Sequence, residues 1–144
     1  MQTGSAIETY RNAVYPWQCD HMGHMNTQFY AAVFDAACFG ILNHVARMPD
    51  LAEKGLGWAD IRQVIEYRHE IRSGTVMLVK SWIVEVGRSS ITVLHHLVED
   101  GRDTLFATSE TKTVLFDLKQ RKARAIEGEF RERALALPKF EAKA

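Results

Sequence analysis

The chain has 144 residues, the length of one domain, and we expect a single domain over residues 1–144 with a frayed end over 139–144. Its 47% apolar and 25% charged residues are typical of a soluble globular protein and exclude a disordered or collagenous chain. Lys plus Arg and Asp plus Glu both number 18, which disfavours nucleic-acid binding because a neutral chain has no overall field to attract phosphates.

The sequence predicts a cytoplasmic protein without a membrane partner. No apolar run approaches the ~20 residues needed to cross a bilayer. The first five residues lack the basic and apolar segments of a secretory signal. Cys19 and Cys38 form no Cys-x-x-Cys pair, so we expect two reduced thiols that pack as small apolar side chains.

The first half of the chain predicts a strand, a loop and one long helix. Residues 7–15 combine β-forming residues with mixed polarity and end at a proline, which predicts an edge strand. A polar, sulfur-rich loop follows over residues 17–25. Asn26 or Thr27 can cap a helix that we predict over residues 28–45. Because this helix is apolar on nearly every side, we expect other structure to enclose it.

The second half of the chain has the pattern of strands. Pro and Gly punctuate residues 47–57, which we expect to separate two elements. The strands, a basic turn and a short final helix are predicted over residues 60–71, 75–86, 91–99, 104–117, 119–124 and 126–137, in that order. One helix followed by a run of strands predicts an α+β fold, with an antiparallel sheet of about five strands wrapped around the helix.

Chemistry is expected in the loop over residues 16–26, which reads PWQCDHMGHMN. Asp20 supplies a carboxylate that is ionised at neutral pH. Gly23 permits a backbone conformation or a close approach that a side chain would block. The N–H groups at the helix start carry partial positive charge. A carboxylate beside such donors suits acyl transfer, because the donors can stabilise the oxygen of a tetrahedral intermediate.

The same residues carry a family resemblance. The run DHMGHMN at residues 20–26, with Tyr30 behind it, is similar to the motif that opens the central helix of the 4-hydroxybenzoyl-CoA thioesterase-like hotdog proteins. Weaker matches follow in the family's order, including the Gly-Arg-Ser-Ser turn at residues 87–90, so the resemblance spans residues 14–121. It implies the hotdog fold and an acyl-CoA thioesterase that needs no cofactor, since coenzyme A is part of its substrate.

The resemblance also implies roles for individual residues. Asp20 would attack the thioester or activate water, and the N–H of Thr27 would polarise the thioester carbonyl. Active sites would lie at the subunit interfaces of a homodimer or homotetramer. We expect His24 to orient or hydrogen-bond groups near the site. The residues expected to contact substrate are Gly23, Asn26, Tyr30 and Trp58, together with Arg88, Ser89 and Ser90 at the phosphates of CoA.

Two departures from the family pattern matter. Gln18 stands where many members have a second Asp, so Asp20 lacks a like-charged neighbour. This favours an ionised Asp20 but leaves nucleophile and general base open. The Tyr that many members carry three residues after the Asn stands four residues after Asn26, at Tyr30.

For the other candidate residues we expect structural or subunit-contact positions instead of catalytic roles. His21 and His24 with Asp20 give three metal ligands without a fourth, so we expect no metal. Asp35 is a second candidate carboxylate, because a related thioesterase type uses an acid on the helix, but we expect it at a subunit contact. His95 and His96 sit in one predicted strand and must point to opposite faces, so we expect surface and interface positions for them.

Two other functions remain open at the level of sequence. A hotdog hydratase or dehydratase would need a His paired with an acid, and His24 with Asp20 or Asp35 could serve. A non-catalytic acyl-CoA-binding protein would need no such group. The acyl group and the choice between dimer and tetramer are not specified by the sequence.

Overall fold

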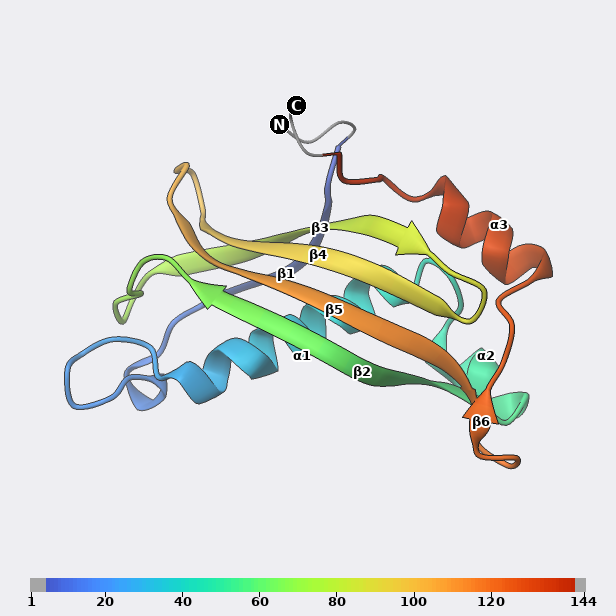
Figure 1. The fold of residues 1–144 in the computed structure, drawn as a ribbon. Helices are drawn as coiled ribbons and strands as arrows, with labels where there is room; N and C mark the ends of the chain where they lie inside the picture. Colours follow the sequence, from blue (N-terminus) through green and yellow to red (C-terminus); the bar gives the residue numbers. More distant parts are fainter. Residues whose placement is uncertain (1–4, 142–144) are drawn as a thin grey trace.

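A six-stranded antiparallel sheet with one long helix on its face forms the centre of the computed structural model, which describes residues 5–141 (Figure 1). Five long strands stand in the order β1-β3-β4-β5-β2, and a short sixth strand pairs with β5. The strands are β1 (Ile7–Ala13), β2 (Leu56–Tyr67), β3 (Val76–Val86), β4 (Ser90–Glu99), β5 (Leu105–Asp117) and β6 (Lys122–Ala123). The predicted α+β architecture and its edge position for the first strand are confirmed.

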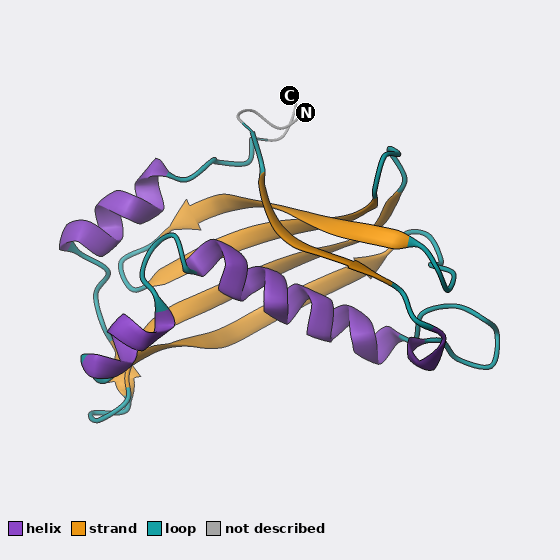
Figure 2. Ribbon diagram, turned by 180° about the vertical axis from the view of Figure 1, so that it is seen from behind, coloured by secondary structure: helices purple, strands orange, loops and turns teal. Residues whose placement is uncertain are grey.

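The helices are α1 (Thr27–Leu42), α2 (Met48–Glu53), α3 (Gly128–Ala136) and the 3-10 turn η1 (Pro16–Gln18). Figure 2 shows α1 lying along one face of the curved sheet, with α2 just beyond its carboxyl end. Within residues 5–141, no helix is long and apolar enough to span a membrane.

Helix α1 buries one stripe of its surface against the sheet. The buried side chains recur every three or four residues, as the helical period requires. They are Tyr30, Val33, Phe34, Ala37, Cys38, Ile41 and Leu42. The opposite stripe, with Ala31, Asp35 and Phe39, is exposed. The expectation of an enclosed helix is therefore wrong for a single chain, because small apolar residues there have no cover within the protomer.

Gly40 lets α1 approach the edge strand β1 closely. A Cβ atom at this position would lie 2.8 Å from the carbonyl oxygen of Thr9 and 2.9 Å from its Cβ. Both distances are shorter than side-chain contacts in proteins, so a larger residue would push the helix away from β1. The glycine thus fixes how deeply α1 sits in the curve of the sheet.

Three segments differ from the sequence predictions. The expected break contains α2, because Pro49 stands in its first turn, where a missing N–H is tolerated. The predicted basic turn contains β6. The first residues of the predicted frayed end are instead bonded to β3. The Ile83 N–H donates to the Pro138 carbonyl and the Phe140 N–H donates to the Ile83 carbonyl, both at 2.8 Å. The rest of the predicted frayed end, residues 142–144, lies outside the described residues.

His95 lies in the core under α1, within a chain of polar side chains. Its Nδ1 is 2.6 Å from Ser81 Oγ, which is 2.8 Å from Thr9 Oγ1, and its Nε2 is 3.5 Å from Cys38 Sγ. His96 points to the other face of the sheet, against Trp82. The predicted opposite orientations are confirmed, but the surface or interface position is wrong for His95, which has no exposed area.

The buried His95 predicts that the protein loses stability in acid. Burial, and then the nearby His96, lower the pKa of His95 to about 3, against about 6.5 in an unfolded chain. Between these values the unfolded chain binds a proton that the folded chain does not. We therefore expect the free energy of unfolding to fall by about 1.4 kcal/mol per pH unit as the pH drops below 6.5. Urea unfolding of the parent and of His95→Gln at pH 7 to 4 measures this slope.

The variant should flatten the slope, whereas replacing the exposed His44 by Gln should leave it unchanged. Equal slopes in the parent and in His95→Gln would contradict a neutral, buried His95.

Candidate active site

The loop between β1 and α1 folds around Asp20 through its own backbone. The Asp20 N–H donates to the His24 carbonyl at 2.9 Å, and the Gly23 N–H donates to the Asp20 carbonyl at 3.0 Å. Asp20 Oδ1 accepts the Met22 N–H at 2.9 Å. Gly23 has φ = +82°, and an added Cβ there would meet nothing within 4 Å. Its left-handed conformation, and not a close approach, is what requires glycine.

Hydrogen bonds on both sides anchor this loop to the rest of the fold. The Asn26 N–H donates to the Gln18 carbonyl and the Met25 N–H to the Ile71 carbonyl, both at 2.8 Å. The Gln18 side chain accepts the Tyr15 N–H at 2.8 Å. Because these contacts link η1, the start of α1 and the segment after β2, the position of Asp20 relative to the helix is fixed.

Asn26 caps helix α1 and leaves one backbone donor open. Its Oδ1 accepts the Gln28 N–H at 3.0 Å, and its carbonyl accepts the Phe29 N–H at 3.0 Å. No hydrogen bond from the Thr27 N–H is found among the described residues. The first N–H groups of a helix carry its positive partial charge, so the Thr27 N–H is a donor available to a ligand.

Loss of the cap should destabilise the helix start. We expect Asn26→Ala to lower the free energy of unfolding by about 1 kcal/mol, because the Gln28 N–H loses its acceptor. Urea unfolding of this variant beside Asn43→Ala, at the carboxyl end of the same helix, measures the effect. The two variants would be equally stable if Asn26 contributed no cap.

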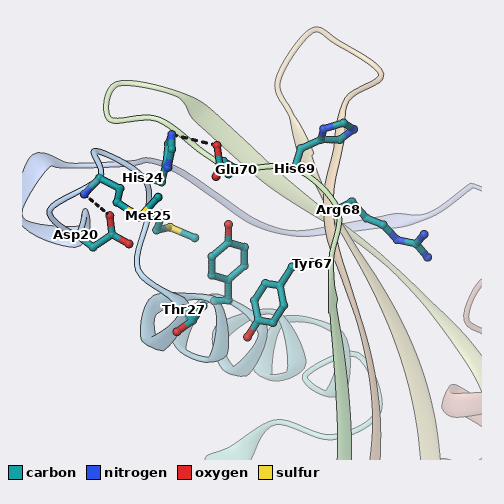
Figure 3. Close-up of a pocket in the computed structure, with 10 residues that line it drawn as sticks. Asp20, His24, Met25, Thr27, Tyr67, Arg68, His69 and Glu70 are labelled. Carbon is teal, nitrogen blue, oxygen red and sulfur yellow. Dashed lines mark hydrogen bonds and ion pairs between the residues drawn. The ribbon is translucent and has the colours of Figure 1, made fainter.

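Asp20 and the start of α1 line one cavity of about 350 Å³. Figure 3 shows Asp20 and His24 reaching it from the loop, Thr27 from the helix, and Tyr67 and Glu70 from the end of β2 and beyond. Its lining residues are Asp20, Met22, His24, Met25, Thr27, Tyr30, Tyr67, Arg68, His69 and Glu70. A carboxylate and an open N–H donor in one cavity can act together on a carbonyl group.

The sequence model of the thioesterase-like superfamily matches residues 14–134, most of the chain. The chain belongs to the thioesterase-like superfamily. It has the hotdog fold and is a thioester hydrolase. Membership of this superfamily supports acyl-CoA thioesterase activity.

Several known proteins are similar to this superfamily member. A betainyl-CoA thioesterase of Pseudomonas aeruginosa is 24% identical over 132 residues, which cover 91% of this chain and 83% of the relative. A structure of a Staphylococcus aureus protein in complex with CoA has a TM-score of 0.83 at 16% identity, covering 92% of this chain and 85% of the other. A thioesterase proposed for Pseudomonas putida KT2440 has a TM-score of 0.80 at 25% identity, with coverages of 94% and 86%.

In this thioesterase-like chain the segment after β2 adds polar groups that the sequence patterns did not indicate. His24 Nε2 lies 3.1 Å from Glu70 Oε2, which ties the Asp20 loop to that segment. Tyr67 packs edge-on against Tyr30, with ring centroids 4.9 Å apart. Burial raises the pKa of Tyr30 to about 12, so its phenol stays protonated and able to donate. The family resemblance also implies that residues of the second strand reach the site, and Tyr67 at the end of β2 does line this cavity.

Of the seven predicted substrate contacts, Tyr30 alone is among the residues that line this cavity. Gly23 and Asn26 belong to the loop that carries Asp20 without lining the cavity, and the other four belong to other parts of the fold. Trp58 lines a second, smaller cavity between α1 and β2. Arg88 and Ser89 lie in the turn between β3 and β4, and Ser90 begins β4, at the opposite end of the sheet from the Asp20 loop (Figure 1). There the Arg88 carbonyl accepts the Ile126 N–H at 2.8 Å and the Ser89 carbonyl accepts the Leu115 N–H at 2.9 Å. One protomer therefore does not bring these residues to Asp20.

Proposed function

We propose that this thioesterase-like protein hydrolyses an acyl-CoA to a free acid and CoA in the Asp20 cavity, with no cofactor. The observation that carries the proposal is the shared cavity of the Asp20 carboxylate and the open Thr27 N–H at the helix start. The carboxylate supplies negative charge on one side, and the helix tip supplies positive partial charge for the oxygen of the thioester carbonyl.

Asp20 can act in this hydrolysis in two ways. As general base, Asp20 takes a proton from water while the oxygen of that water attacks the carbonyl carbon. As nucleophile, its carboxylate attacks the same carbon and forms a mixed anhydride that water then cleaves. In both, the Thr27 N–H stabilises the negatively charged oxygen, and the C–S bond breaks to release the CoA thiolate. The His24–Glu70 pair holds the loop that carries Asp20.

The outer edge of β2 supports pairing with a second copy of the chain. Strand β2 stands at the end of the sheet and has no neighbour on its outer side among the described strands. Ile61, Val64 and Tyr67 are 60%, 39% and 52% exposed along it, and Phe39 on α1 is 48% exposed beside the uncovered stripe of that helix. An exposed strand edge that also carries apolar side chains is open to pairing, and antiparallel pairing of β2 with its copy would join the two sheets.

Such pairing would complete the active site from two subunits. In an antiparallel pair, the Tyr67 end of one strand meets the Leu56 end of the other. The Asp20 cavity of one protomer would then face Trp58 of its partner, and the partner's turn over residues 87–90 would lie near enough to contact the CoA arm.

Arg88→Ala should then raise KM for an acyl-CoA about tenfold with little change in kcat. The variant removes a phosphate contact that is equally strong in the bound substrate and in the transition state.

A thiol-release assay over a panel of acyl-CoAs tests the proposed function. The panel includes aromatic, short, branched and medium acyl groups, and betainyl-CoA because of the Pseudomonas aeruginosa relative. Release of CoA from at least one ester is expected. The His24–Glu70 pair is an acid and a histidine within hydrogen-bond distance, as a hydratase needs, so enoyl-CoA is assayed in parallel for hydration. Hydration without thiol release, or saturable binding without any turnover, would overturn the proposal.

A further inference from the structure

Hydrolysis with Asp20 as the nucleophile needs a second proton acceptor. Attack by the Asp20 carboxylate releases the CoA thiolate and leaves the carboxyl group bound to the acyl group as a mixed anhydride. In that state Asp20 is no longer a free carboxylate. Another group must therefore take the proton of the water that cleaves the anhydride, and that group has to lie in the Asp20 cavity.

His24 is the side chain of the cavity that fits this requirement. The phenol of Tyr30 stays protonated, because burial raises its pKa to about 12. Arg68 keeps its charge, and Figure 3 shows Arg68 and His69 turned away from Asp20. His24 reaches the cavity from the loop that carries Asp20, and its side chain is only 23% exposed. A neutral imidazole can accept a proton at one nitrogen while the other nitrogen carries hydrogen.

A short antiparallel pairing places Glu70 beside His24. His24 forms a bridge with Arg72, and the Met25 N–H donates to the Ile71 carbonyl at 2.8 Å. In an antiparallel pairing, residues two apart on one segment share a face, so Glu70 stands diagonally across from His24. Its Oε2 lies 3.1 Å from His24 Nε2 (Figure 3). The backbone and the side chain of His24 are thus both held by the segment after β2.

The contact with Glu70 determines which nitrogen of His24 can act as a base. A carboxylate attracts the nitrogen that carries hydrogen, so Nε2 bears the proton of the neutral ring and Nδ1 keeps its lone pair. No described residue hydrogen-bonds to Nδ1. On Asp20, Oδ1 accepts the Met22 N–H, whereas Oδ2 has no hydrogen-bond partner within residues 5–141 and is the oxygen that can attack a carbonyl carbon.

We propose that His24 is a second catalytic residue, which takes the proton of the hydrolytic water once Asp20 has formed the mixed anhydride, and that Glu70 is its positioning residue. This inference rests on the proposed function and divides its chemistry between two side chains. Water gives its oxygen to the acyl carbon and one proton to Nδ1, while the bond between the acyl carbon and the Asp20 oxygen breaks. Asp20 returns as a carboxylate, and the released acid ionises in water. The proton on His24 then passes to the CoA thiolate, which becomes the free thiol.

Rapid-quench thiol release by His24→Gln tests this division, with the best ester of the acyl-CoA panel. Anhydride formation does not need His24, so the first turnover should release about one thiol per active site at close to the parent rate. The steady-state rate after this burst should be at least about 10²-fold below the parent kcat, because the water has lost its base. Mass spectrometry during the slow phase should find the chain heavier by one acyl group.

Glu70→Gln should show the same burst, with a steady-state rate at least about tenfold below the parent, because the ring of His24 loses the group that orients it. Glu70 is 67% exposed, so this variant tests the inference even if the loss of His24 unfolds the loop. Two matched controls should behave as the parent. They are His21→Gln, in the same loop but outside the cavity lining, and Glu53→Gln, on the exposed side of α2.

A parent-like kcat in His24→Gln would overturn the inference and leave hydrolysis by Asp20 standing. Slow thiol release from the first turnover onward, without a burst, would mean that His24 acts before the anhydride forms or only shapes the loop, and would also overturn it. Parent behaviour of Glu70→Gln would contradict the positioning role of Glu70. A parent that releases no thiol from any ester of the panel would overturn the proposed function itself.

Discussion

Asp20→Asn should lose at least about 10²-fold in kcat on a good acyl-CoA while remaining folded. The amide can neither take a proton from water nor attack the thioester carbonyl. Its Oδ1 can still accept the Met22 N–H, which Asp20 Oδ1 accepts at 2.9 Å, so the loop should keep its shape. Thiol release measures the rate, and thermal unfolding measures whether the fold is intact.

Asp103→Asn makes the same chemical change on an exposed loop outside the cavity and should behave as the parent. If Asp20→Asn cleaved the substrate at the parent rate, Asp20 would be neither base nor nucleophile. A variant that unfolds well below the parent's melting temperature would instead place Asp20 among the structural residues of the loop.

Ile61→Glu should dissociate the protein into monomers and lower activity at least about tenfold. Ile61 is 60% exposed on the outer edge of β2, so the charge is easily hydrated in a single chain. In a two-fold antiparallel pair, residues near the middle of the strand approach their own copies, and two carboxylates would repel each other there. The active site would then lose the groups that the partner supplies.

Leu135→Glu is the matched control, because Leu135 is 63% exposed on α3, away from the β2 edge. Light scattering coupled to size-exclusion chromatography gives the mass of each variant, and thiol release gives its activity. Full activity in a monomeric parent or in a monomeric Ile61→Glu would contradict a site completed by two subunits.

The fold was predictable because local signals agreed with the global arrangement. The cap at Asn26, the apolar residues of α1 and the β-rich second half each point to one helix on an antiparallel sheet. The short α2 was missed because Pro49 was interpreted as a breaker, whereas a proline in a first helical turn is tolerated. The pairing of residues 138–140 with β3 is a tertiary contact without a local pattern.

The residues of the candidate site that come from one short segment were predictable, whereas those that distant segments bring to it were not. Asp20, Gly23 and Thr27 lie within eight residues, so spacing alone places a carboxylate, a turn and a helix start together. Glu70 reaches His24 from a segment more than forty residues away, and no sequence period links the two. The burial of His95 was missed because alternation along a strand gives two faces without showing which one the helix covers.

The most direct test of hydrolysis at the helix tip is a crystal structure of Asp20→Asn with an unhydrolysed acyl-CoA. We expect the thioester oxygen about 2.7–3.1 Å from the Thr27 nitrogen, with the substituted amide side chain at position 20 beside the carbonyl carbon. A thioester bound with its carbonyl away from the Thr27 N–H, or outside the Asp20 cavity, would contradict hydrolysis at this site.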